Sequence, residues 1–548
     1  MPTTYRTTAM RTHPEATPVV AAEDSRYAND AAPFALQQRR RHAIADLVSG
    51  RRHLAASVRG VRRLILSLTA LSLATSAVAQ ERTVSVTIRP SVERPSTVFE
   101  GWGTALAWFA DVTGGWPEPD RARLADLFYG DDGLGWTIAR YNIGGGNAAA
   151  TSPYLRPGAA VPGFWRQPAN TTGRDWWRAD NDAMWDWSQD ARQRWWLDAV
   201  RHRVRTPIFE AFSNSPPWFM TVSGRVSGAE KGTTDNLRPG YERPFADYLA
   251  RVVDELQRRH RITFRTLSPV NEPNTDYWFA KNTQEGSHWS PARQATMIDA
   301  TDAALKAHGL ATAIAAPDET NSHLFLQDWA AYPAATRARI GQLNVHSYGT
   351  VNQTGVRDVA RASGIRLWMS ENDTPLDKDP QDLEGMPSAL AFAEHIVLDL
   401  KRLEPAAWIF WQAVETTAPS GAGSNWGLIK TDLRSPAADH HQIYLTRKYW
   451  AMAQFSRYIK PGYRLVSVDD LDTAGAISPD GRTMVLVHVN GGLNPRALVL
   501  PRGWHTQMVV TDSSHVADCI PGTIVPPRAI ATVLLTRKVE RASCSAGR

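Results

Sequence analysis

Residues 264–273 read FRTLSPVNEP, and residues 366–372 read RLWMSEN. Each stretch begins as a short β-rich run and passes into polar residues that include a glutamate, Glu272 in the first and Glu371 in the second. In a closed barrel of parallel strands, functional groups lie at the carboxyl ends of the strands. The two stretches therefore predict barrel strands that bring two carboxylates to the same rim.

Six further β-rich runs flank these two, and amphipathic helical patterns separate them. The eight predicted strands are Phe99–Thr104, Thr137–Asn142, Pro207–Phe212, Phe264–Val270, Ala313–Ala316, Gln342–His346, Arg366–Glu371 and Ala407–Trp411. The clearest helical patterns are Pro244–His260, Pro291–His308 and Pro387–Leu403, with apolar residues at three- to four-residue spacing. Eight β/α units of this size predict an α/β fold, a (β/α)8 TIM barrel over residues 99–456.

A different pattern follows the barrel. In residues 457–538, short apolar runs alternate with Pro-Asp-Gly, Asn-Gly-Gly and Pro-Arg-Gly turns, which predicts an appended antiparallel β-sandwich. Val84, Val86 and Ile88 alternate in the same way, so we expect residues 80–98 to supply N-terminal strands to this sandwich. Residues 539–548 form a tail.

The first 79 residues have the character of a leader. Arginines at positions 59, 62 and 63 precede an apolar run, Leu64–Ala74, which is followed by Ala77-Val78-Ala79. This order predicts a secretory signal peptide cleaved after Ala79. The run is short for a membrane span, so we expect a secreted or periplasmic protein without a membrane anchor.

The distribution of charge bears on the partner. The chain has a formal net charge of +6, but residues 1–79 hold 11 basic and 5 acidic side chains, which leaves the remainder with no net charge. A basic surface for nucleic acid is therefore not expected. Six tryptophans between positions 176 and 196 suit either sugar stacking or core packing. We expect a monomer that binds a polysaccharide or oligosaccharide.

The two glutamates carry the chemistry. Paired carboxylates across a sugar can act as acid/base and nucleophile in glycoside hydrolysis. An isolated glutamate is more often a salt-bridging loop residue, but two at barrel strand ends favour catalysis. A carbohydrate-binding barrel without catalysis is the alternative from another functional class.

Several motifs resemble a known family. SPVNEP at 268–273 and LWMSE at 367–371 resemble the two catalytic strands of clan A glycoside hydrolases. The chain is similar to glycoside hydrolase family 30 from about residue 84 to 536, and most to its endo-β-1,6-galactanase-like branch. The motifs that carry this resemblance are FEGWGTALAWFA at 99–110, ARYNIGGGN at 139–147, SNSPPWFMT at 213–221, NVHSYGT at 344–350 and WIFWQ at 408–412.

The resemblance implies a retaining mechanism with Glu272 as acid/base and Glu371 as nucleophile, about 5–5.5 Å apart. Asn271 would bond the sugar 2-hydroxyl, although a turn-stabilising role is the alternative. Arg140 would pair with Glu371 and lower its pKa. Tyr348 would donate to the nucleophile, or else pack at the barrel mouth.

The remaining candidates concern the cleft. Trp411 would be the floor on which the sugar at the nucleophile stacks. The residues that would line the cleft are Trp102, Asn142, Asn214, Trp218 and Gln412. Those on the loop after the acid, with binding or structural roles, are Tyr277, Trp278, Glu285, His288 and Trp289. The mechanism needs no metal or cofactor.

The expected substrate is a β-1,6-linked galactan of the arabinogalactan side-chain type, cleaved internally. Neither catalytic motif distinguishes an axial from an equatorial 4-hydroxyl. A β-1,6-glucan or a β-xylan, cleaved by the same retaining chemistry, is therefore the alternative. Cys519 and Cys544 could form a disulfide in an oxidising compartment.

Overall fold

The computed structural model describes residues 82–91, 97–373, 383–416, 426–433 and 440–537 of the 548-residue chain. These residues fall within one compact unit, Ala77–Arg548. The leader 1–79 with its predicted cleavage site, the tail 539–548 and Cys544 lie outside the described residues. Cys519 is disulfide-bonded.

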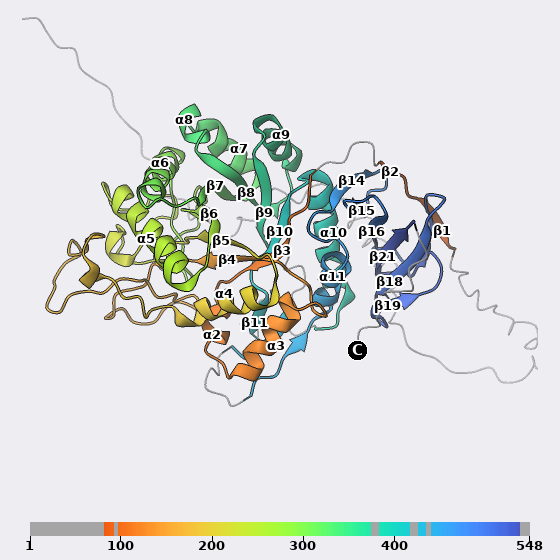
Figure 1. Ribbon diagram of the computed structural model, residues 1–548, viewed down its shortest axis with the longest axis horizontal. Coiled ribbons are helices and arrows are strands. Elements are labelled where there is room, and N and C mark those ends of the chain that lie inside the picture. The colour runs from red at the N-terminus through yellow and green to blue at the C-terminus, as the bar shows by residue number, and fades with distance from the viewer. Residues whose placement is uncertain (1–81, 92–96, 374–382, 417–425, 434–439, 538–548) are drawn as a thin grey trace, which may run out of the picture. The chain divides into compact units, whose positions relative to one another are not determined.

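Eight parallel strands close into a barrel in the order β10-β3-β4-β5-β6-β7-β8-β9 (Figure 1). Their bounds are β3 (Gly101–Ala105), β4 (Ile138–Asn142), β5 (Ile208–Phe212), β6 (Phe264–Ser268), β7 (Ala313–Asn321), β8 (Ile340–Gly349), β9 (Arg366–Asn372) and β10 (Ala407–Phe410). Each corresponds to one predicted strand, so the TIM barrel is confirmed. The structure extends β7 to Asn321 and β8 to Gly349, beyond the predicted ends at Ala316 and His346.

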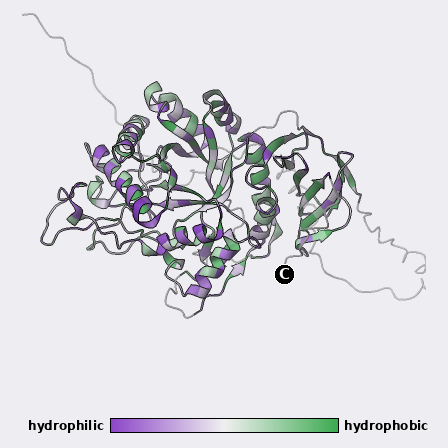
Figure 2. Cartoon of the chain, viewed as in Figure 1, coloured by the Kyte–Doolittle hydropathy of each residue, from purple (hydrophilic) through white to green (hydrophobic). Residues whose placement is uncertain are grey.

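Helices cover the barrel, and the three predicted from periodicity are confirmed as α5, α6 and α10. The helices of the described chain are α2 (Phe109–Thr113), α3 (Glu118–Tyr129), α4 (Ala191–Arg203), α5 (Glu242–His260), α6 (Pro291–Ala307), α7 (Ser322–Ala331), α8 (Ala334–Arg337), α9 (Gln353–Ser363), α10 (Met386–Arg402) and α11 (Arg447–Ser456). Proline occupies the first turn of α6 and α10, where its missing N–H costs no hydrogen bond. Helix α10 is mostly hydrophobic in Figure 2, whereas α5 alternates. Nowhere in the described chain is a helix both long and apolar enough to cross a membrane.

A β domain follows the barrel. Its larger sheet has the order β19-β18-β21-β16-β15-β14-β2, and its smaller sheet the order β1-β17-β20. The bounds are β1 (Val84–Thr87), β2 (Pro90–Ser91), β14 (Arg464–Val468), β15 (Thr473–Ile477), β16 (Thr483–Asn490), β17 (Arg496–Val499), β18 (His505–Thr511), β19 (Val516–Ile520), β20 (Ile524–Val525) and β21 (Ala529–Thr536). Side chains from both sheets share one core, which includes Met484, Leu498 and Val533. One pairing departs from the antiparallel expectation, because β1 runs parallel to β17.

A small sheet lies between these parts in the sequence. Its strands are β11 (Val414–Thr416), β12 (Ile429–Thr431) and β13 (Tyr444–Leu445). Because β11 begins four residues after β10 ends, this sheet continues the chain from the carboxyl end of the last barrel strand.

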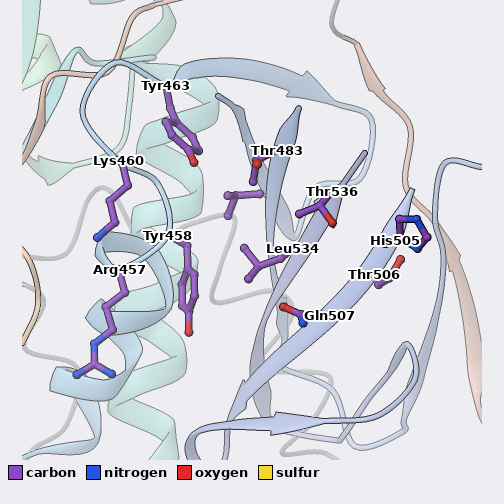
Figure 3. Close-up of a pocket in the computed structure, with 11 residues that line it drawn as sticks. Arg457, Tyr458, Lys460, Tyr463, Thr483, His505, Thr506, Gln507, Leu534 and Thr536 are labelled. Carbon is purple, nitrogen blue, oxygen red and sulfur yellow. The ribbon is translucent and has the colours of Figure 1, made fainter. Parts of the chain in front are cut away.

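Helix α11 joins the barrel to the β domain through the buried side chain of Gln454. Its amide oxygen accepts from the backbone N–H of Thr532 at 3.1 Å, and its amide nitrogen donates to the hydroxyl of Thr511 at 2.8 Å. A cavity of about 440 Å³ lies beyond the end of α11, against β16, β18 and β21 (Figure 3). It is lined by Arg457, Tyr458, Lys460, Tyr463, Thr483, Val485, His505, Thr506, Gln507, Leu534 and Thr536. None of these belongs to the predicted site.

Gln454→Ala should lower the free energy of unfolding by about 1–3 kcal/mol, because it leaves the buried backbone N–H of Thr532 without its acceptor and removes a donor to the Thr511 hydroxyl. The measurement is equilibrium denaturation followed by fluorescence. Gln327→Ala, on the exposed face of α7, is the matched control and should change stability little. Equal effects of the two substitutions would contradict the assigned role of Gln454.

Candidate active site

The two predicted glutamates meet at the carboxyl ends of β6 and β9. A carboxylate oxygen of Glu272 and one of Glu371 lie within 4.8 Å of each other, and the residues are 6% and 4% exposed. Glu272 has a positive φ of 45°, and its backbone N–H donates to the carbonyl of Asp318 at 2.9 Å. The backbone of the turn after β6 thus has a conformation that residues other than glycine rarely adopt. Such turns persist where the surrounding structure fixes them.

His346, on β8, lies between the two carboxylates. Its Nδ1 is 3.1 Å from Glu272 Oε1 and 3.5 Å from Glu371 Oε1, and its Nε2 is 3.2 Å from Asp318 Oδ1. Burial alone would lower the pKa of His346, but the charge of Glu371 and the hydrogen bonds with Asp318 and Glu272 raise it to about 10. The imidazole is therefore a cation at neutral pH, placed between the two acids.

Arg140, on β4, is a second buried cation. Its Nε donates to Glu210 at 2.7 Å and its Nη2 to Asp318 at 2.5 Å, while its Nη1 donates to the carbonyl of Ser370 at 3.0 Å. The same Nη1 lies 3.5 Å from Glu371 Oε2. Burial would raise the pKa of Asp318, but Arg140 and His346 hold it below its usual value. Arg140 therefore contacts three acidic side chains, and Glu371 is the most exposed of them.

Opposing effects act on Glu371. Burial raises its pKa and the charges of His346 and Arg140 lower it, while the neighbouring Glu272 raises it again, to about 7 overall. The hydroxyl of Tyr348 donates to Glu371 Oε1 at 3.0 Å. Tyr348 is 39% exposed, so its ring also contributes to the open surface of the site.

The loop after β6 fixes Glu272. The phenol of Tyr277 donates to Glu272 Oε2 at 2.5 Å, and the indole N–H of Trp278 donates to its backbone carbonyl at 2.9 Å. Asn271, directly before it, is 3% exposed, and its Oδ1 has no hydrogen-bond partner among the described residues. That oxygen is an acceptor available to a ligand.

At the end of β10, Trp411 and Gln412 lie beside the end of β9. The backbone N–H of Trp411 donates to the carbonyl of Asn372, and its ring meets Trp108 edge to face at 5.1 Å between centroids. The Nε2 of Gln412 donates to Glu415 at 2.6 Å. Both residues are therefore held in fixed orientations near Glu371.

The structure corrects the predicted cleft-lining role of Trp102, and it gives Trp278 and Trp289 the structural one of their two predicted roles. Trp102 is 1% exposed, packs near Phe455 of α11 and donates its indole N–H to the carbonyl of Ile459, because its side chain points outward from β3. Trp289 is 1% exposed and stacks on Phe245 of α5. Trp278 is 2% exposed and packs over Gly286. Each is a packing residue.

The remaining candidates are buried residues that end or follow barrel strands or belong to the loop after β6. Asn142 is buried and donates to Glu285 Oε2 at 3.1 Å, and Glu285 also accepts from the N–H of Gly145. Burial raises the pKa of Glu285 to about 8. Asn214 and Trp218 follow β5 and are buried. His288, by contrast, bonds Asp235 of a preceding loop.

The tryptophan cluster is mostly core. Trp176, Trp177, Trp185 and Trp196 are each at most 9% exposed. Trp185 stacks on Tyr248 of α5 at 5.6 Å. Packing against the helices therefore accounts for most of this cluster, and sugar stacking is not required to explain it.

Sequence reasoning missed three charged residues. His346 stands two residues before Tyr348 on one strand, so the period of two could have placed both on the same face. Glu210 is a lone acid inside the buried strand IFEAF, which is itself a signal of a partner. Asp318 lay beyond the predicted end of its strand, so no pattern directed attention to it.

Comparison with known proteins identifies the family. The family model described as O-glycosyl hydrolase family 30 matches residues 83–343. An endo-β-1,6-galactanase from Hypocrea rufa is 31% identical over 455 residues, which cover 79% of this chain and 86% of that protein. An exo-β-1,6-galactobiohydrolase from Bifidobacterium longum subsp. longum is 30% identical over 518 residues, covering 73% of this chain. This chain spans only 34% of that second relative.

The fold agrees with this relationship. The catalytic domain of a family 30 xylanase C from Talaromyces cellulolyticus superposes with a TM-score of 0.60 at 19% identity, covering 82% of this chain and all of that domain. At this identity the likeness concerns the fold, a barrel with a β domain. With a relative above 30% identity covered over most of its length and two buried glutamates at the barrel mouth, the chain belongs to O-glycosyl hydrolase family 30 and is a glycosidase.

Proposed function

We propose that this glycosidase is a retaining endo-β-1,6-galactanase that acts on galactan side chains of the arabinogalactan type. The observation that carries the retaining mechanism is the spacing of Glu272 and Glu371, whose oxygens lie within 4.8 Å. Inverting enzymes hold their carboxyl groups about 6.5–9.5 Å apart to admit a water molecule. The similarity to the Hypocrea rufa endo-β-1,6-galactanase supports the sugar, the linkage and the internal cleavage.

In the first step, Glu371 attacks the anomeric carbon and forms a glycosyl ester, while Glu272 gives its proton to the departing glycosidic oxygen. In the second step, Glu272 removes a proton from water, and the water oxygen displaces Glu371 from the anomeric carbon. Two inversions at that carbon give net retention. Glu371 is thus needed as the carboxylate, and Glu272 as acid and then as base.

The surrounding groups suit these roles. His346 and Tyr348 both face Glu371 Oε1, where they stabilise the charged form before attack and the leaving carboxylate afterwards. Asn271 presents an unpartnered oxygen to the sugar 2-hydroxyl. Trp411 offers an aromatic face for the C–H side of the ring.

We also propose that the protein is exported and works as a monomer. Export rests on the basic, apolar and Ala-x-Ala order before residue 80. The monomer is proposed because Glu272, Glu371 and the charged side chains that bond them all stand on, or directly after, the strands of one barrel.

The purified full-length protein should release mixed galacto-oligosaccharides early from β-1,6-galactan, and little from β-1,6-glucan or β-xylan under the same conditions. The measurement is chromatography of products over time, with NMR of the first product to establish its anomer. Glu371→Ala protein is the control on each polymer.

Cleavage of glucan or xylan in place of galactan would change the assigned substrate and leave the proposed retaining mechanism unchanged. An inverted first product would refute the retaining mechanism. Binding of a polymer without any cleavage would favour a carbohydrate-binding protein.

Glu371→Ala should lower turnover by at least about four orders of magnitude, and azide should restore it with an activated aryl glycoside. Azide then takes the place of the missing nucleophile, so the glycosyl azide has the inverted configuration. Glu272→Ala should instead yield the retained azide and lose more activity on poor leaving groups than on activated ones. Azide products are identified by NMR.

Glu255→Ala is the matched control, because Glu255 is a buried glutamate of α5 bonded to Arg259. It should give neither azide product. Retained activity in Glu371→Ala would rule out Glu371 as the nucleophile. Azides of the opposite configurations would exchange the roles of Glu272 and Glu371.

Tyr348→Phe should move the acidic limb of the kcat/KM profile to higher pH by about one unit. The wild-type limb should lie near pH 7, since burial raises the pKa of Glu371 to about 7 and only its carboxylate reacts. Removing a donor to the charged form raises that pKa further, so activity is lost at a higher pH as pH falls. Tyr449→Phe, whose phenol bonds the carbonyl of Leu127, should leave the limb in place.

A further inference from the structure

Buried acceptors without partners gather beside the nucleophile. Asp373, two residues after Glu371, is 1% exposed, and neither of its carboxylate oxygens has a hydrogen-bond partner among the described residues. The Oε1 of Gln412, a side chain with no exposed surface, also has no hydrogen-bond partner among the described residues, and Gln412 follows the neighbouring strand end. Neither residue takes a proton or forms a bond in the proposed mechanism.

Asp373 lies close to side chains of the proposed catalytic site. It follows Asn372, whose carbonyl accepts from the backbone N–H of Trp411 at 2.9 Å, so it lies where strands β9 and β10 end together. Its charge raises the pKa of the Tyr348 phenol, which is itself bonded to Glu371. The carboxyl is therefore close to the same groups that would hold the sugar.

Gln412 is oriented by a rigid frame. Its Nε2 donates to Glu415, which leaves Oε1 on the other side of the amide as an acceptor. Glu415 accepts both contacts of Arg156 Nη2, at 2.9 and 2.7 Å, and the guanidinium of Arg156 lies 4.1 Å from the ring centroid of Trp108. Trp108 in turn contacts Trp411. These contacts fix the amide of Gln412 relative to Trp411, the residue on which the sugar is proposed to stack.

Unpartnered buried acceptors need an explanation. Taking a carboxyl group out of water without hydrogen bonds is costly, and most buried polar groups in folded proteins have a partner. Burial raises the pKa of Asp373 to about 7, with Lys448, Lys430 and Arg156 acting in the opposite direction. Sugar hydroxyls are donors of the kind that these acceptors lack.

We propose that Asp373 and Gln412 Oε1 bind hydroxyl groups of the sugar unit that becomes attached to Glu371, and that Asp373 makes the reaction depend on its 3- or 4-hydroxyl. A carboxylate accepts with both oxygens and holds a hydroxyl more strongly than a neutral group does. Removing that hydroxyl leaves the buried carboxyl unpaired again, so the enzyme rejects the analogue. Asp373 is thereby a specificity-determining residue. This inference rests on the proposed function.

The test is a cycle of one substitution and one missing hydroxyl. The probes are 4-nitrophenyl β-1,6-galactobioside and its analogues lacking the 3- or the 4-hydroxyl of the ring that bears the aryl group. Wild type should lose about 10–100-fold in kcat/KM on one analogue. On the parent compound, Asp373→Asn should have a kcat/KM at least about 10-fold below that of wild type. Removing the hydroxyl should then lower the kcat/KM of this variant by less than about 3-fold further.

Asp190→Asn is the matched control. Asp190 is also a buried carboxyl, but it precedes α4 and bonds Tyr141 and Gln193 outside the barrel mouth. It should keep the full wild-type loss on the deoxygenated substrate. Asp373→Ala is the second variant and should give the same non-additivity as Asp373→Asn, with circular dichroism to confirm folding.

Additive losses in Asp373→Asn and Asp373→Ala for both analogues would overturn the inference, because Asp373 would then hold water or support the fold only. If wild type hydrolyses an aryl glucoside or xyloside and not the galactobioside, the proposed galactan substrate is refuted, and the role of Asp373 is still open to the same test. The same cycle on the hydrolysed compound then decides the role of Asp373.

Discussion

The site depends on the buried guanidinium of Arg140. It has no exposed surface, and its carboxylate partners Glu210 and Asp318 have none either. Charges in such a place are tolerated only when paired and hydrogen-bonded. The partners come from β5 and β7, and Ser370 of β9 adds a carbonyl, so these charges are paired only when the strands stand side by side in the closed barrel.

This pairing sets the electrostatics of catalysis. Arg140 keeps Asp318 charged, Asp318 holds one side of His346, and the other side of His346 faces Glu272 and Glu371. Two acids within 4.8 Å repel each other when both are charged. The imidazolium between them and Arg140 behind them offset that repulsion, which suits the proposed roles of the pair as acid/base and nucleophile.

The barrel, its strand order and its three clearest helices followed from the sequence, because alternation and 3.6-residue periodicity reflect which faces are buried. The positions of Glu272 and Glu371 followed for the same reason, since a strand end in a barrel is a defined place. Trp102 was misplaced, and Trp289 has the structural one of its two predicted roles. A tryptophan is equally suited to a core and to a sugar platform, and only the direction of the side chain separates the two.

The sequence by itself determined the architecture, the family and the two acids, since these depend on local patterns and ordered motifs. The tertiary structure alone decided the partners of those acids. His346, Asp318 and Glu210 stand on three different strands, and Asp373 and Gln412 follow the ends of β9 and β10, which are joined by the bond from Trp411 to Asn372. Charge pairing and unpartnered acceptors depend on distances across the barrel, which no spacing along the chain contains.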